Sequence, residues 1–213
     1  MIEIENVSIH NVEGAIRGMR NPMNSWYLSD SFYADKEPVE LHHFGNYVIG
    51  DKDFELGCKL AKSGTDHRKF LRQIMVCIDI TAPLYWWKEF DTYKVGTVAN
   101  SCSTMHKLTS KPIERSDFSF DNAEVEHYED LIDIIVNNCE NLRQIYNINK
   151  NKEIWRMLIQ ILPEAYNQKR TVTLNYEVLA NIYKSRKGHK LNEWHTFCEW
   201  IESLPCFEWV NNK

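Results

Sequence analysis

Residues 75–106 restrict the fold of this chain more than any other stretch. Residues 75–80, MVCIDI, alternate apolar and polar side chains and include β-branched residues, which is the pattern of a half-buried strand. Pro83 follows, and proline is favoured in the first turn of a helix, where its missing N–H loses no hydrogen bond. The next run, LYWWKEF, is too apolar for a helix exposed on all sides, and residues 97–106 are small and polar. This succession predicts the wall, floor and rim of a ligand site, with a core helix and an ordinary loop as the alternative.

Composition and charge describe an ordinary globular chain. Of the 213 residues, 43% are hydrophobic and 26% are charged, which favours one compact domain over residues 1–213. The net charge of -5 argues against a broad nucleic-acid-binding surface. No apolar run approaches the roughly 20 residues of a membrane span, and the acidic start MIEIE does not resemble a secretory signal. We therefore expect a cytoplasmic protein that does not cross a membrane.

The cysteines and histidines predict neither disulfides nor a metal site. The six cysteines are scattered and form no C-x-x-C pair, as is usual for thiols in a reducing compartment. The chain has no H-E-x-x-H motif, no phosphate-binding Walker loop and no G-x-G-x-x-G.

Apolar periodicity predicts strands near both ends of the chain and long helices between and after them. We expect a strand near the N-terminus, a connection over 165–170, a short strand over 171–174 and an open loop or hairpin over 111–122. The expected helices cover residues 12–19, 51–63, 121–146, 153–162, 176–186 and 191–204. In the longest of them the core-facing stripe should consist of Leu131, Ile134, Ile135, Leu142 and Ile145. The pattern predicts an α/β (α+β) fold.

Several short motifs occur in a distinctive order. His67-x-x-Phe-Leu precedes the strand, Ala82-Pro83-Leu-Tyr opens the aromatic helix, and Leu162-Pro163 follows the long helices. Asn175, Asn181 and Arg186 then lie at fixed offsets on the next predicted helix. In this order the chain resembles the flavin-dependent thymidylate synthase family over roughly residues 55–200. That family has an Ala-Pro-x-Phe helix, an R-H-R-x-x-S-x-N-E-x-S-x-R-Y signature, a Leu-Pro turn and a late helix with the spacing Asn-x-Arg-x-x-x-Asn-x-x-x-x-Arg.

The resemblance implies a fold, a reaction and a set of site residues. The fold would be a central, mostly antiparallel sheet flanked by long helices, in a homotetramer whose Trp86-Trp87 helix packs in the core or between subunits. The reaction would be flavin-dependent methylation of the dUMP to dTMP type, with FAD and, by analogy, methylene-tetrahydrofolate and NADPH. The resemblance assigns His67, Asn175, Asn181 and Lys94 to the flavin, assigns Arg186, Asn100 and Ser103 to a pyrimidine deoxynucleotide, and makes Arg186 and Ser103 catalytic.

The chain departs from the family pattern at several arginines. The Arg-His-Arg triplet reads Thr92-Tyr93-Lys94, and two further family arginines read Ile159 and Glu177. Cys102 takes the place of Ser103 if no residue is inserted in the signature. Arginine binds phosphate and uracil through a planar fork, which lysine and threonine cannot reproduce. A non-catalytic relative that serves as a nucleotide-binding or protein-interaction module, encoded by a phage or mobile element, is therefore the alternative, and an unrelated α/β protein is a third reading.

The proposed site residues also have plain structural readings. Arg186 can be a cation that stabilises a helix C-terminus, and Asn175 can be a helix N-cap. Asn181 can simply face solvent, as can Lys94 and His67.

Overall fold

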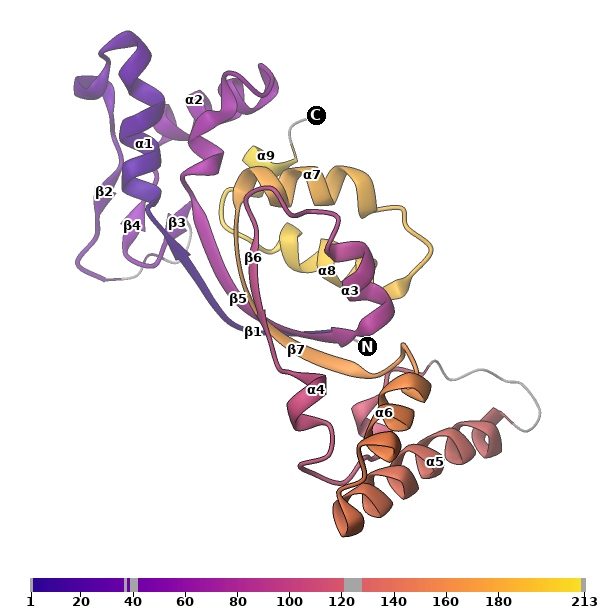
Figure 1. Ribbon diagram of the computed structural model, residues 1–213. Helices are drawn as coiled ribbons and strands as arrows, with labels where there is room; N and C mark the ends of the chain where they lie inside the picture. The colour runs from indigo at the N-terminus through magenta and orange to yellow at the C-terminus, as the bar shows by residue number, and fades with distance from the viewer. Residues whose placement is uncertain (1, 37, 39–41, 121–127, 212–213) are drawn as a thin grey trace. The chain divides into compact units, whose positions relative to one another are not determined.

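The computed structural model describes residues 2–36, 38, 42–120 and 128–211. Its main sheet has four strands in the order β1-β5-β7-β6 (Figure 1). These strands are β1 (Glu3–His10), β5 (Met75–Pro83), β7 (Asn167–Asn175) and β6 (Val98–Ser101). A small antiparallel sheet consists of β2 (Phe32–Tyr33), β4 (Tyr47–Val48) and β3 (His43–Phe44). The predicted α+β class with a mostly antiparallel sheet and long helices is confirmed.

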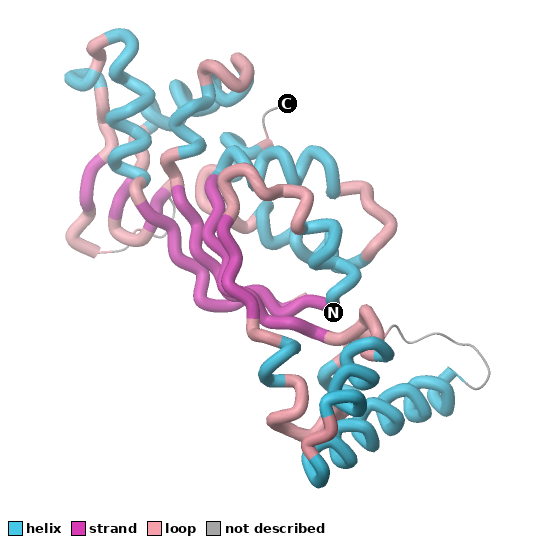
Figure 2. Tube along the Cα trace, viewed as in Figure 1, coloured by secondary structure: helices cyan, strands magenta, loops and turns pink. Residues whose placement is uncertain are grey.

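Contacts divide the chain into two compact units, each described here by itself. Unit 1 contains residues 1–4, 80–92 and 100–171, and unit 2 contains residues 5–79, 93–99 and 172–213. The helices of unit 1 are α3 (Leu84–Phe90), α4 (Thr104–Lys107), η4 (Arg115–Asp117), α5 (Tyr128–Asn149) and α6 (Lys152–Ile161). Those of unit 2 are α1 (Val12–Arg20), η1 (Asn21–Met23), η2 (Trp26–Leu28), α2 (Asp51–Lys62), η3 (Arg68–Arg72), α7 (Tyr176–Arg186), α8 (Asn192–Glu202) and α9 (Phe207–Val210). Figure 2 distinguishes helices, strands and loops along the same trace.

Strand β5 and helix α3 follow the sequence pattern closely. Burial alternates along β5, with Val76, Ile78 and Ile80 buried. Helix α3 begins at Leu84, so Pro83 ends the strand and caps the helix instead of entering its first turn. Trp86 and Trp87 are fully buried inside the single chain. Their core reading is therefore confirmed, and the expectation that they lie between subunits is wrong.

Two strands extend into stretches that were expected to be loops. Residues 167–170, part of the predicted connection, form the start of β7, where the buried Gln168 lies among polar neighbours. Residues 98–101, part of the predicted polar loop, form β6, whose residues are all exposed. Since β6 is an outer strand of the sheet, its side chains need not be apolar. Strand pairing thus overrides weak local propensity at both places.

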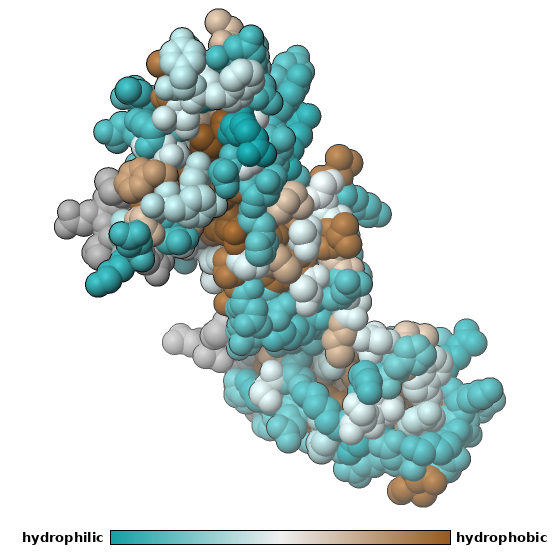
Figure 3. All heavy atoms as spheres, turned by 90° about the vertical axis from the view of Figure 1, so that its left-hand side faces the viewer, coloured by the Kyte–Doolittle hydropathy of each residue, from teal (hydrophilic) through white to brown (hydrophobic). Residues whose placement is uncertain are grey.

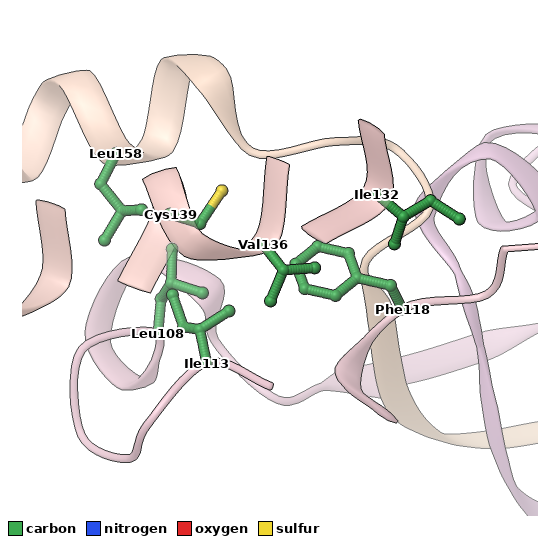
Figure 4. Close-up of a cluster of buried hydrophobic side chains, with 7 residues drawn as sticks. All are labelled: Leu108, Ile113, Phe118, Ile132, Val136, Cys139 and Leu158. Carbon is green, nitrogen blue, oxygen red and sulfur yellow. The ribbon is translucent and has the colours of Figure 1, made fainter. Parts of the chain in front are cut away.

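The long helix α5 buries a face that overlaps the expected one only in part, since of the predicted stripe Leu142 packs against the core of unit 1 and Ile135 is half-buried. Its described residues begin at Tyr128, and residues 121–127 of the predicted helix lie outside the described residues. Ile132, Val136 and Cys139 face the core of unit 1, whereas Leu131, Ile134 and Ile145 are exposed. Figure 4 shows the buried cluster, which joins α5 and α6 to the segment after α4 and consists of Leu108, Ile113, Phe118, Ile132, Val136, Cys139 and Leu158. Helix α5 therefore carries a second apolar stripe that no described residue covers.

The visible surface in Figure 3 is mostly hydrophilic, with hydrophobic residues scattered over it. None of the helices in the described part of the chain combines the length and the apolar character needed to cross a membrane. In the same residues, His, Cys, Asp and Glu side chains form no group of three that could hold a metal ion.

Candidate functional site

The predicted site residues divide between the two units. Asn175, Asn181 and Arg186 lie at the start, in the middle and at the end of α7 in unit 2, which also contains His67 and Lys94. Asn100 and Ser103 belong to unit 1.

Arg186 contacts two aromatic rings of unit 2. Its Nε donates a hydrogen bond to the Tyr93 hydroxyl at 2.9 Å. Its guanidinium carbon lies 4.7 Å from the centre of the Trp194 ring and 5.6 Å from that of Tyr93. Such cation–π contacts orient a guanidinium without neutralising it. The two aromatic partners were not predicted as site residues, although Tyr93 lies inside the altered Arg-His-Arg triplet.

Asn175 caps helix α7. Its Oδ1 accepts a hydrogen bond from the backbone N of Val178 at 3.0 Å, and its side chain is buried. Gly96 approaches it closely, because a Cβ added to Gly96 would lie 3.0 Å from Asn175 Nδ2, and Gly96 has a φ of +82°. The capping alternative is therefore confirmed for Asn175. Asn181 and Lys94 are exposed.

His67 lies at the edge of a cavity in unit 2. The cavity has a volume of about 720 Å³ and is lined by Gly18, Met19, Asn21, Pro22, Met23, Ser25, Leu56, Leu60, Asp66, His67, Lys69, Phe70, Arg72 and Gln73. His67 is the cap of η3, and the next residue, Arg68, donates from Nε to Glu177 Oε1 of α7 at 3.0 Å. This ion pair ties the wall of the cavity to α7, and it gives Glu177 a partner at a position where the family has arginine.

Ser103 and Cys102 lie in a cavity of unit 1. The cavity has a volume of about 490 Å³ and is lined by Glu3, Thr81, Cys102, Ser103, Thr104, Lys107, Leu108, Lys111, Ser116, Asp117, Phe118, Ser119, Phe120, Tyr166, Asn167, Gln168 and Lys169. We call it the lysine cavity. Ser103 Oγ caps α4 by accepting from the backbone N of His106 at 3.2 Å. Asn100 is exposed on β6 and does not line this cavity.

A chain of polar contacts fixes the Cys102–Ser103 segment. Asp91 binds Arg170 Nη1 at 2.8 Å, and Arg170 Nε donates to Gln168 Oε1 at 2.9 Å. Gln168 Nε2 then donates to the carbonyl oxygen of Cys102 at 2.9 Å. Arg170 also stacks over the Trp87 ring at 4.2 Å. The polar residues that made 167–170 look like a connection thus hold one wall of the lysine cavity.

Charged groups fix the segment that carries Lys111. Glu140 of α5 accepts from the backbone N of Ile113 at 2.8 Å, and its hydrogen bonds with Arg143 lower the pKa of Glu140 to about 2. Lys111 donates to Asp117, and this hydrogen bond raises the pKa of Lys111. Burial, followed by the charge of Asp117, raises the pKa of Tyr166. At neutral pH the cavity therefore presents an ammonium group and a neutral phenol.

Comparisons with known proteins bear on the fold of this chain. No protein-family model matches the chain, and no curated protein matches its sequence. The crystal structure of Thymidylate Synthase X (ThyX) from Helicobacter pylori with FAD and dUMP matches with a TM-score of 0.73 and 16% identity, covering 98% of this chain and 96% of that chain. A second structure of that enzyme, complexed with FAD and dUMP, has a TM-score of 0.68 and 18% identity, with 94% of each chain covered.

A third matching structure is a UMP/dUMP methylase, PolB from Streptomyces cacaoi, bound with 5-Br dUMP. It has a TM-score of 0.60 and 12% identity, and the match covers 99% of this chain and 93% of that chain. The chain therefore has the fold of these proteins over nearly its whole length. The resemblance found in the sequence is confirmed at the level of the fold.

Proposed function

We propose that this chain is a divergent flavin-dependent methyltransferase of the thymidylate synthase type, acting on a pyrimidine deoxynucleotide. The observation that carries the proposal is the fold, which is shared along almost the whole chain with a Helicobacter pylori enzyme crystallised with FAD and dUMP. Two cavities of suitable size for small molecules, one beside His67 and one beside Ser103, support it.

The cavity beside His67 fits the chemistry of FAD. Lys69 and Arg72 supply cations for a pyrophosphate, and Met19, Leu56 and Phe70 supply apolar walls for a ring system. We assign His67 of this cavity to the cofactor, and by the resemblance alone also Lys94, Asn175 and Asn181 of unit 2, which do not line the cavity. When bound, reduced flavin would supply the electrons that turn a methylene group from methylene-tetrahydrofolate into a methyl group, with NADPH as the source of those electrons.

Arg186 and Ser103 have separate roles toward the nucleotide in this proposal. Arg186, oriented by Tyr93 and Trp194, donates to the uracil through the fork of its guanidinium. Ser103 presents a hydroxyl in the lysine cavity, whereas Asn100, on β6 outside that cavity, is assigned to the nucleotide by the resemblance alone. The six free cysteines support the cytoplasmic location that belongs to the same proposal.

The assay that tests this function is methylation of dUMP. The purified chain is incubated with FAD, NADPH, methylene-tetrahydrofolate and dUMP, and dTMP is measured by chromatography. We expect dTMP to form only when flavin and folate are both present. If FAD binds but no dTMP forms from dUMP or UMP, the proposed reaction is wrong.

We also propose a homo-oligomer, a tetramer by the resemblance, assembled through the second apolar stripe of α5. The exposed stripe consists of Leu131, Ile134, Ile145 and Ile148, and the neighbouring α6 adds the exposed Met157 and Ile161. A helix with apolar residues on two opposite faces is usually covered on both. Leu131, Ile134 and Ile145, which sequence periodicity assigned to the core, are thus available to a second copy.

Glutamate at Ile134 and Ile148 should therefore break the oligomer. We expect the Ile134→Glu, Ile148→Glu chain to elute as a monomer in light-scattering chromatography while its circular dichroism stays unchanged, because both positions are solvent-exposed in the single chain. Val95→Glu, at an exposed apolar residue of unit 2, is the matched control and should keep the mass of the unaltered protein. A wild-type chain that is already a monomer at micromolar concentration would refute the oligomer.

A further inference from the structure

Resting on the proposed function, we propose that the lysine cavity of unit 1 binds the phosphate of a nucleoside monophosphate through Lys107 and Lys111, with the base against the half-buried rings of Phe120 and Tyr166. The resemblance assigns neither lysine to a ligand. Lys107 and Lys111 neutralise the substrate's phosphate in a chain that lacks several of the family's arginines.

The charge of the lysine cavity suits a phosphate. Its lining contains Lys107, Lys111 and Lys169 against Glu3 and Asp117, so the lysines outnumber the carboxylates by one. In the described part of the chain no hydrogen bond or ion pair joins the ammonium group of Lys107 to another side chain. Lys111 donates to Asp117, which leaves further N–H donors on the same ammonium group. Two ammonium groups on the same cavity can therefore bind a dianion.

The rest of the lining suits a nucleoside. Phe118 and Phe120 stack with ring centres 5.5 Å apart, and Tyr166 meets Phe118 edge to face at 5.6 Å. Because Phe118 is buried, the half-buried rings of Phe120 and Tyr166 are the ones that can stack on a base. Thr104, Ser116 and Ser103 add hydroxyl groups for a sugar or a base edge. The volume of about 490 Å³ lies in the range of small-molecule sites.

Hydrogen bonds fix two segments that line this cavity, so the site is formed before a ligand binds. The Gln168–Cys102 hydrogen bond fixes one side, and the Glu140–Ile113 hydrogen bond fixes the segment that carries Lys111. A ligand entering a preformed site loses less free energy to ordering the protein than one that must organise it.

Calorimetric titration of the full-length, flavin-free chain with dUMP and with deoxyuridine tests the proposal. We expect Lys107→Ala and Lys111→Ala each to weaken dUMP binding by about tenfold, since each removes a charge-assisted contact. Deoxyuridine, which lacks the phosphate, should bind the variants and the unaltered chain equally. Lys152→Ala, at an exposed lysine of α6 outside the cavity, is the matched control.

A second measurement locates the ligand without altering a lysine. Cys102 lines the cavity and is exposed, whereas the other cysteines are buried or half-buried. We expect dUMP to slow alkylation of Cys102 by a maleimide, with Cys102→Ser identifying the labelled residue. Unchanged dUMP affinity in both lysine variants, or alkylation unaffected by saturating dUMP, would overturn the proposal. If the chain methylates dUMP while the lysine variants bind normally, only this inference fails; if the lysines bind dUMP but no methylation occurs, only the proposed function fails.

Discussion

Replacing Asp53 with alanine is expected to lower the free energy of unfolding by about 3–5 kcal/mol, because it leaves a buried arginine without its partner. Asp53 is fully buried on α2, and its Oδ1 accepts from Nε of the buried Arg20 at 2.5 Å. Its Oδ2 accepts from the hydroxyls of Ser29 and Ser31 at 2.6 Å and 2.7 Å. One carboxylate thus joins α1, α2 and the segment before β2, all within unit 2.

Urea denaturation at neutral pH measures this effect. Asp51→Ala is the matched control, since Asp51 is exposed in the first turn of the same helix and should contribute less than about 1 kcal/mol. Equal losses of unfolding free energy in Asp53→Ala and Asp51→Ala would show that the buried carboxylate stabilises this region no more than an exposed one does.

The contribution of Asp53 should also depend on pH. Burial alone would raise the pKa of Asp53, but hydrogen bonds from Ser29, Ser31 and Arg20 outweigh it and hold the pKa below its usual value. The unfolded chain therefore takes up the proton first as the pH falls. The stabilisation is complete above the ordinary aspartate pKa of about 3.9 and is lost as the pH falls through the lower folded value. The difference between the unaltered chain and Asp53→Asn should accordingly shrink below about pH 4.

Arg186→Ala is expected to lower kcat/KM for dUMP by roughly 100-fold or more. A charge-assisted hydrogen bond contributes about 1.5–3 kcal/mol, and the fork of arginine makes two of them with a planar acceptor. Arg186→Lys should recover little, because an ammonium group keeps the charge but not the fork. Loss of the stacking on Trp194 should change stability by only about 1 kcal/mol, so the binding defect can be separated from unfolding.

Steady-state rates and dUMP titrations of the same variants check this assignment. Arg17→Ala on α1, at an exposed arginine of the same unit, should behave as the unaltered chain does. Unaltered dUMP binding in Arg186→Ala would remove Arg186 from the site and leave it as a structural cation at the end of α7.

The sequence predicted the elements whose local pattern agrees with their packing. Strand β5 alternates because one face is buried, and α7 ends at Arg186 as its periodicity indicated. Strand β6 and the start of β7 were missed because pairing within a sheet, not side-chain hydrophobicity, makes them strands. Gln168 could be recognised as structural only once Cys102 and Arg170 were placed beside it.

The apolar stripe of α5 shows a different limit of periodicity. Spacing identifies a face that avoids water, but it does not identify what covers that face. Here the core of the chain takes Ile132 and Val136, while the stripe with Leu131 and Ile134 remains exposed. The site residues have the same ambiguity, since the spacing that suggested a ligand for Asn175 is also the spacing of a helix cap.

Titration of the purified chain with FAD, followed by visible absorbance, measures whether this fold binds a flavin. We expect saturable binding with a perturbed flavin spectrum, weakened when His67 and Arg72 of the unit 2 cavity are replaced by alanine. Lys62→Ala, at an exposed lysine outside that cavity, should leave the titration unchanged. A chain that leaves the flavin spectrum unchanged at saturating concentrations would contradict the proposed function and show that this fold serves here without a flavin.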